Sequence, residues 1–212
     1  MEMLRIKICG ITNTEDAIEA IACGADALGF VFYGKSPRSV KPEAARSIIS
    51  SLPPIVTTIG VFVDEDMTNL ENIISYTGLD AVQLHGSESP EYFNLSRKTI
   101  KAIRVKDLAD LKQLNQYRAA AAFLLDTYSP ESIGGTGHIF NWEIAVEAKK
   151  LGRVILAGGL TPDNIEDAVK LVQPYAVDVA SGVEGSIKGK KDHKKLKLFI
   201  ERARKASLKY YL

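Results

Sequence analysis

The sequence predicts an α/β fold, a single-domain (β/α)8 barrel of the TIM type. Three observations predict it. Strand-like and helix-like segments alternate along the whole chain, there are eight of each, and 212 residues give about 26 residues per strand–helix unit. A crossover between parallel strands needs about a dozen residues or more, so the spacing suffices. Because α/β barrels commonly use about 200 to 250 residues as one domain, we expect one domain over residues 1–212.

The predicted strands are short, apolar and rich in Val, Ile, Leu and Phe. They alternate little between polar and apolar residues, as expected for parallel strands covered on both faces. In chain order they span residues 5–10, 27–32, 55–63, 81–84, 99–103, 121–126, 154–157 and 176–180.

The predicted helices lie between these strands, and several carry start or stop signals. Thr161 before Pro162 is typical of a helix N-cap followed by proline in the first turn. Gly24, Gly78 and Gly152 each follow a helical pattern, as helix-terminating glycines do. The helices span residues 14–22, 42–51, 67–76, 90–96, 108–117, 141–150, 162–171 and 193–206.

An open, doubly wound sheet is the alternative architecture. It more often has fewer strands and a glycine-rich dinucleotide turn after the first one. Here the first strand is followed by Gly10-Ile11-Thr12-Asn13, which lacks that fingerprint. Eight units therefore favour the closed barrel.

Composition and charge exclude several protein classes. The net charge of +1 gives no overall field toward nucleic acid or membrane, so we expect neither as a partner. The longest apolar run, residues 119–125, falls far short of the ~20 residues of a membrane helix. The N-terminal residues carry no apolar signal region, and two cysteines form no disulfide framework. We therefore expect a cytoplasmic protein.

In a barrel, the carboxyl ends of the strands and the loops after them form the active face. Gly158-Gly159 follows the seventh strand and Ser181-Gly182 follows the eighth. Glycine lets backbone N–H groups approach a phosphate closely, and these two loops are the usual phosphate site of the fold. Tight turns also use glycine, but the two pairs together favour a phosphate site.

Four other side chains end or follow strands, and each has a competing structural role. Asp126 ends a long apolar run, where desolvation raises a carboxyl pKa and a general acid can form; it could equally be a cap or an ion-pair partner. Cys9 is a possible base or an apolar filler. His85 is a proton shuttle, a substrate contact or a structural histidine. Arg38 suits a carboxylate or is a surface charge.

The remaining polar features indicate less chemistry. The connection over residues 127–140 contains Gly134-Gly135-Thr136-Gly137, and its length and glycine content favour a substrate-covering loop. His138, His193 and the lysine-rich run 188–195 are interpreted as solvated. No spacing of His, Cys, Asp and Glu resembles a metal site, so no metal is predicted.

Taken in order, these residues resemble the phosphoribosylanthranilate isomerase family of tryptophan biosynthesis. Each matching stretch is weak alone, but the ordered set spans nearly the whole chain and is specific. The stretches are Lys7-Ile8-Cys9-Gly10-Ile11, Gly29-Phe30-Val31-Phe32, Ser36-Pro37-Arg38, Gln83-Leu84-His85-Gly86, Asp126 with Gly134-Gly135-Thr136-Gly137, Ala157-Gly158-Gly159-Leu160 and Ser181-Gly182-Val183-Glu184.

The resemblance implies a (β/α)8 barrel that catalyses an Amadori rearrangement without a cofactor. N-(5-phosphoribosyl)anthranilate becomes 1-(2-carboxyphenylamino)-1-deoxyribulose 5-phosphate. The family pattern makes Asp126 the general acid at the ring oxygen and Cys9 the general base at C2′. Arg38 would hold the anthranilate carboxylate and His85 would contact the substrate. The phosphate would lie against Gly158, Gly159, Ser181 and Gly182, with Gly135 closing over it.

Some positions depart from the family pattern, and two rival functions remain. The family often has Lys where His138 stands, Asp at Asn141 and Pro at Gly34. We expect altered loops there rather than lost activity. A related sugar-phosphate isomerase of histidine biosynthesis places an aspartate on the first strand, which Cys9 disfavours. A non-catalytic metabolite-binding barrel would need neither Cys9 nor Asp126. The family includes both monomers and homodimers.

Overall fold

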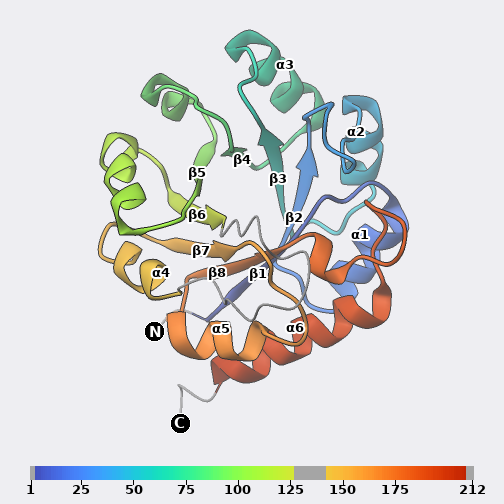
Figure 1. Cartoon of the computed structure of the whole chain (residues 1–212). Coiled ribbons are helices and arrows are strands. Elements are labelled where there is room, and N and C mark those ends of the chain that lie inside the picture. Colours follow the sequence, from blue (N-terminus) through green and yellow to red (C-terminus); the bar gives the residue numbers. More distant parts are fainter. Residues whose placement is uncertain (1–2, 127–141, 209–212) are drawn as a thin grey trace.

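Eight parallel strands close into one barrel in the computed structural model, which describes residues 3–126 and 142–208. Each strand pairs with the next in chain order, and the first pairs with the last. Figure 1 shows the strands forming a ring with the helices around it. The predicted closed barrel is therefore confirmed. The strands are β1 Arg5–Cys9, β2 Ala27–Val31, β3 Thr57–Phe62, β4 Ala81–Leu84, β5 Lys98–Arg104, β6 Ala122–Asp126, β7 Val154–Ala157 and β8 Ala176–Val179.

The crossovers are mostly α-helices, but those after β4 and β5 are 3-10 helices, labelled η1 and η2. In η2, the Asp107 and Asp110 side chains form a capping box at the first turn. A third 3-10 turn, η3, follows β8. The helices are α1 Thr14–Ala22, α2 Pro42–Ser50, α3 Met67–Thr77, η1 Pro90–Asn94, η2 Leu108–Tyr117, α4 Glu143–Ala148, α5 Ile165–Val172, η3 Ser181–Val183 and α6 His193–Leu208.

Several sequence-predicted boundaries differ from the structure by one to three residues, and two of these differences have a clear structural cause. The third strand begins at Thr57 rather than at Ile55, because its ladder with β2 starts at the Ala27–Thr57 pair; Ile55 lies outside it and is 94% exposed. Thr161 is not the N-cap of a helix starting at Pro162. Its hydroxyl accepts from the Asp163 N–H, but α5 begins only at Ile165.

Side-chain alternation separates two apolar layers. Outward residues of the strands, among them Ile6, Ile8 and Val177, pack against the helices in the larger core. Inward residues such as Ile59, Ile100 and Leu124 fill the barrel interior. Because the interior is packed rather than open, a cavity can form only beyond this apolar plug, at the carboxyl ends of the strands.

The opposite end of the barrel is held together by Arg204 of α6. Its guanidinium donates to the carbonyl oxygens of Leu4 and Gly24 and pairs with Asp26 at 2.7 Å. The last helix is thereby fixed to both ends of the first strand–helix unit. No helix in the described ranges is long and apolar enough to cross a bilayer.

Candidate functional site

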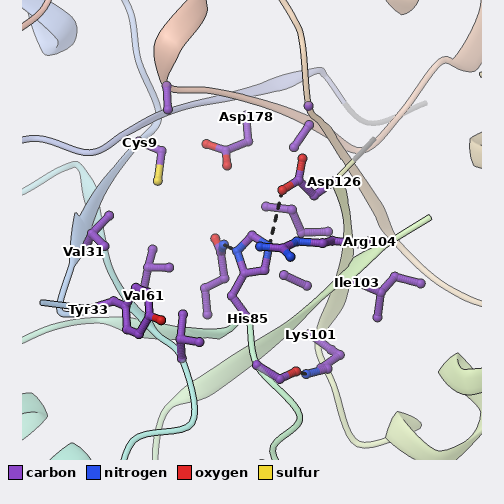
Figure 2. Close-up of a pocket in the computed structure, with 18 of the residues that line it drawn as sticks. Cys9, Val31, Tyr33, Val61, His85, Lys101, Ile103, Arg104, Asp126 and Asp178 are labelled. Carbon is purple, nitrogen blue, oxygen red and sulfur yellow. Dashed lines mark hydrogen bonds and ion pairs between the residues drawn. The ribbon is translucent and has the colours of Figure 1, made fainter. Parts of the chain in front are cut away.

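A cavity of about 980 Å³ opens at the carboxyl ends of the strands. Each strand, or the loop directly after it, contributes to its lining, and Figure 2 shows side chains converging on it from all around the ring. The lining includes Cys9, Val31, Tyr33, Arg38, Val61, Gln83, His85, Arg104, Asp126, Gly158, Gly159, Asp178, Ser181 and Gly182. Every site residue predicted from the sequence that lies in the described ranges therefore lines this one cavity.

Cys9 lies at the end of β1, at the floor of this cavity. The residue is 8% exposed, with Val31 and Val61 beside it. Burial raises the pKa of its thiol above the ordinary value, because desolvation penalises the thiolate. Lys7 opposes that shift as a charge and as a hydrogen-bond donor, and Lys191 opposes it more weakly. The thiol is therefore protonated at neutral pH before substrate binds.

Lys7 forms a buried ion pair directly beneath the thiol. It lies two residues before Cys9 on the same inward face of β1, and its Nζ is 3.0 Å from Asp178 Oδ1 on the adjacent β8. Burial acts to lower the pKa of Lys7, but Asp178 and Cys9 raise it by more, so the net shift is upward. The ammonium therefore stays charged although its side chain is only 3% exposed.

Asp126 ends β6 on the other side of the cavity, beside His85 (Figure 2). Its Oδ2 lies 3.4 Å from His85 Nε2, and the carboxylate side chain is 30% exposed. The carboxylate extends past the apolar run of β6 into the open mouth of the cavity, so it is only partly buried. His85 Nδ1 faces the amide nitrogen of Gln83 at 3.3 Å. The donor and acceptor roles at this contact depend on the tautomer of the imidazole.

Arg38 lines the cavity but already has a protein partner. Its Nε and Nη2 bind the two carboxylate oxygens of Glu184 at 2.7 and 2.8 Å. Lys191 Nζ also contacts Glu184, at 3.2 Å, and donates to the carbonyl oxygen of Cys9 at 2.7 Å. This network fixes the loops after β2 and β8 to the end of β1, and the Nη1 edge of Arg38 is the part left for a ligand.

The loops after β7 and β8 pack against each other through backbone. A Cβ on Gly182 would lie 1.8 Å from the carbonyl oxygen of Leu160, so only glycine fits there. Gly158 and Gly159 both have positive φ, 79° and 65°. Together with Ser181 they line the same part of the cavity wall. Two glycine turns in contact give a surface of accessible backbone of the kind that holds a phosphate.

Sequence reasoning missed four charged residues in or directly behind this site, of which Asp178 lines the cavity. Lys7, Asp178 and Glu184 were given no role, and Lys191 was interpreted as part of a solvated run. The Lys191 side chain is in fact fully buried, and its Nζ donates to three acceptors there. The available signal for Lys7 was a charge two residues before Cys9, on the same face of a strand. Predicted Gly135 and the departures at His138 and Asn141 lie outside the described residues.

The arrangement places two proton-transfer groups on opposite sides of one cavity. Cys9, at the end of β1, lies on one side, and Asp126 with His85 lies on the other (Figure 2). Within residues 3–126 and 142–208, no three His, Cys, Asp or Glu side chains converge as metal ligands would. Such a site can add a proton to one end of a bound molecule and remove one from the other.

Comparison with known proteins gives matches over nearly the whole chain. The model of the N-(5′-phosphoribosyl)anthranilate isomerase family matches residues 6–202. The enzyme of that name from Geobacter sulfurreducens is 53% identical over 203 residues, covering 95% of this chain and 99% of the relative. The crystal structure of phosphoribosyl anthranilate isomerase from Thermotoga maritima has a TM-score of 0.89 at 45% identity and covers 96% of this chain and 100% of that one.

Two further solved structures describe ligand binding and assembly in relatives. A phosphoribosyl anthranilate isomerase in complex with reduced 1-(o-carboxyphenylamino)-1-deoxyribulose 5-phosphate is 42% identical, with a TM-score of 0.86, covering 96% of this chain and 100% of that one. Monomers generated from the dimeric Thermotoga maritima enzyme are 41% identical, with a TM-score of 0.85 and the same coverage. The first of these relatives binds a phosphorylated ligand, and the second is derived from a dimer.

Proposed function

The chain belongs to the N-(5′-phosphoribosyl)anthranilate isomerase family, and from that premise we propose that Cys9 and Asp126 are its catalytic base and acid. It is an aldose–ketose isomerase of tryptophan biosynthesis. The observation that supports the two assignments is their placement: one thiol and one carboxylate face the same cavity from opposite sides of the barrel.

The proposed reaction begins at Asp126. Its carboxyl group protonates the furanose ring oxygen, the C1′–O bond breaks, and the nitrogen lone pair forms the Schiff base. The thiolate form of Cys9 then removes the proton from C2′, giving the neutral thiol and an enol amine that tautomerises to the ketone, 1-(2-carboxyphenylamino)-1-deoxyribulose 5-phosphate. His85, whose Nε2 lies 3.4 Å from Asp126 Oδ2, would hold the carboxylate left after the first proton transfer.

The ends of the substrate would be held by the cavity wall. The anthranilate carboxylate would meet the Nη1 edge of Arg38, which Glu184 keeps oriented. The phosphate would lie on the paired turns of Gly158, Gly159, Ser181 and Gly182, with Gly135 contributing from the loop after β6. The reaction is an internal proton rearrangement, so we propose that it uses no cofactor.

We further propose that residues 1–212 act as one domain, working in the cytoplasm as a monomer or homodimer. Two free thiols, Cys9 and Cys23, suit a reducing compartment. Light scattering during size-exclusion chromatography measures the mass and decides between one copy and two.

A direct isomerase assay tests the assignment of acid and base. Cys9→Ala and Asp126→Asn should each lower kcat by ~10² to 10⁴-fold, the usual contribution of general acid–base groups. Cys23→Ala, at the C-cap of α1, and Asp167→Asn, on the surface of α5, are the matched controls and should retain activity. Full turnover by both test variants would overturn the assignment. Binding of the reduced product without turnover by the wild type would favour the non-catalytic barrel.

A further inference from the structure

Lys7 and Asp178 form an ion pair inside the barrel that the two-residue mechanism above does not use. Lys7 on β1 is the direct ladder neighbour of Asp178 on β8, and both side chains point inward. The pair is 3.0 Å long, and its side chains are 3% and 9% exposed. Buried pairs of this kind add little stability over well-packed apolar residues, so stability alone does not account for one at this position.

The ammonium of this pair reaches the level of the Cys9 sulfur. Gly29 on β2 lies beside Cys9 in the sheet, and a Cβ placed on it would lie 2.8 Å from Cys9 Sγ and 3.1 Å from Lys7 Nζ. Both atoms therefore flank the space that Gly29 leaves empty. Figure 2 shows the Asp178 carboxylate beside Cys9 in the same corner of the cavity.

Forming a thiolate at this buried position requires a nearby positive charge. The charged groups around Cys9 are Lys7 on the same strand, Asp178 on β8, Arg38 after β2 and Lys191 before α6. Arg38 and Lys191 both bind Glu184, whose negative charge offsets them. Burial also outweighs Glu184 at Lys191 and lowers the pKa of that amine. Lys7 is therefore the best-placed cation for the sulfur.

We propose that Lys7 is a positioning residue whose ammonium stabilises the thiolate of Cys9, and that Asp178 holds this ammonium in place. The proposal rests on Cys9 being the catalytic base. Lys7 supplies the charge that makes a buried thiol usable as a base. Asp178 keeps Lys7 protonated. Because Asp178 is itself negative, it also opposes ionisation of the Cys9 thiol.

The two residues have opposite effects on Cys9, which separates this role from a structural one. Lys7 lowers the pKa of the thiol, whereas Asp178 raises it. Lys7→Met should therefore raise that pKa, and Asp178→Asn should lower it. General loosening of the site would move both variants in the same direction.

The test measures the thiol directly. In a Cys23→Ser background, Cys9 is the one thiol of the chain, and the pH dependence of its alkylation by iodoacetamide gives its pKa. Lys7→Met should raise the midpoint by about one to three pH units, the usual effect of losing a nearby opposite charge. Asp178→Asn should lower it, and Lys7→Arg should remain close to the parent. Lys101→Met, which removes another buried, paired lysine on β5, is the matched control and should leave the midpoint unchanged.

A double variant keeps the test valid if a single variant unfolds. Lys7→Met/Asp178→Asn leaves no unpaired buried charge, and its thiol pKa should still exceed that of the parent, because Lys7 has the larger effect. Circular dichroism and thermal unfolding establish that each protein is folded. Unchanged midpoints in folded Lys7 variants, or shifts in the same direction for Lys7→Met and Asp178→Asn, would overturn the proposal.

Kinetics connect the thiol to turnover and separate the two proposals. Below the thiol pKa, each unit of upward shift removes about nine-tenths of the thiolate. Lys7→Met should therefore lose about tenfold in kcat per unit, with KM nearly unchanged, and should recover as the assay pH is raised. If Cys9→Ala remains active, the assignment of the base is wrong. If Cys9→Ala is inactive while Lys7→Met is fully active at neutral pH, only the role of Lys7 is wrong.

Discussion

Arg38 binds Glu184 through two parallel hydrogen bonds, Nε to Oε1 at 2.7 Å and Nη2 to Oε2 at 2.8 Å. The planar guanidinium is thus held at two points, which fixes the direction of its remaining edge. A cation held in this way can offer a substrate carboxylate one preferred orientation.

Arg38→Lys should raise KM for phosphoribosylanthranilate by about tenfold or more and affect kcat less. An ammonium cannot bind both oxygens of Glu184 and a substrate carboxylate in a fixed plane, and a KM effect indicates lost substrate binding. Steady-state kinetics measure it. Arg202→Lys, which changes a surface pair with Asp163, serves as the control. An unchanged KM would place the carboxylate elsewhere.

Gly182→Ala should weaken substrate binding and lower stability. The new Cβ would lie 1.8 Å from the Leu160 carbonyl oxygen, so the two turns must separate. Overpacking of this kind typically costs about 1–3 kcal/mol of unfolding free energy, and KM should rise as the phosphate surface opens. Urea unfolding and kinetics measure the two effects. Gly185→Ala, three residues further, meets nothing within 4 Å and should change neither.

Glu88→Gln should lower the unfolding free energy by about 3–5 kcal/mol, because it leaves Lys101 buried without its countercharge. Glu88 Oε2 is 2.8 Å from Lys101 Nζ, and both side chains are at most 2% exposed. The double variant Glu88→Gln/Lys101→Met should recover most of the loss. If denaturant unfolding shows additive losses instead, the pair is not energetically coupled.

Glu184 should make the fold more sensitive to acid. Burial alone would raise the pKa of its carboxyl, but Arg38 and Lys191 lower it by more, so the folded pKa is below the unfolded one. A lowered carboxyl pKa stabilises the fold fully above the unfolded value, about 4.3, and the effect is lost as pH falls through the folded value. The stability difference between wild type and Glu184→Gln should therefore shrink below about pH 4 in urea titrations. A difference independent of pH would contradict this.

The sequence predicts the fold well because strand periodicity and strand number are local properties. All eight strands and the helices between them are found, and Gly78 ends α3 in a left-handed conformation as predicted. The error at Thr161 arises because its hydroxyl accepts from the Asp163 N–H in a turn before α5 begins. The error at Ile55 arises where strand pairing decides. A β-ladder begins only where the neighbouring strand has a partner residue, and no pattern within residues 55–63 encodes that.

Site residues that stand at the ends of strands could be predicted from the sequence. Contacts that depend on the pairing register of two strands could not. The sequence places Cys9 and Asp126 at strand ends, whereas their assignment as base and acid comes from the family resemblance. The contact of Lys7 with Asp178 follows only from the pairing of β1 with β8. Lys191 resembles its neighbours in a run of five lysines, and only the fold shows that this one side chain is buried.

The pairing of β1 with β8 has a consequence for how the chain folds while it is being synthesised. Lys7 and Cys9 leave the ribosome early, but their partners Asp178 and Lys191 follow 171 and 182 residues later. Contacts of such sequence separation form late in folding. Nascent chains can acquire helices and paired central strands while Lys7 still lacks its partner Asp178. If Cys9 is the base as proposed, we expect activity to arise only when synthesis is nearly complete, and a chain that ends before Asp178 to be inactive.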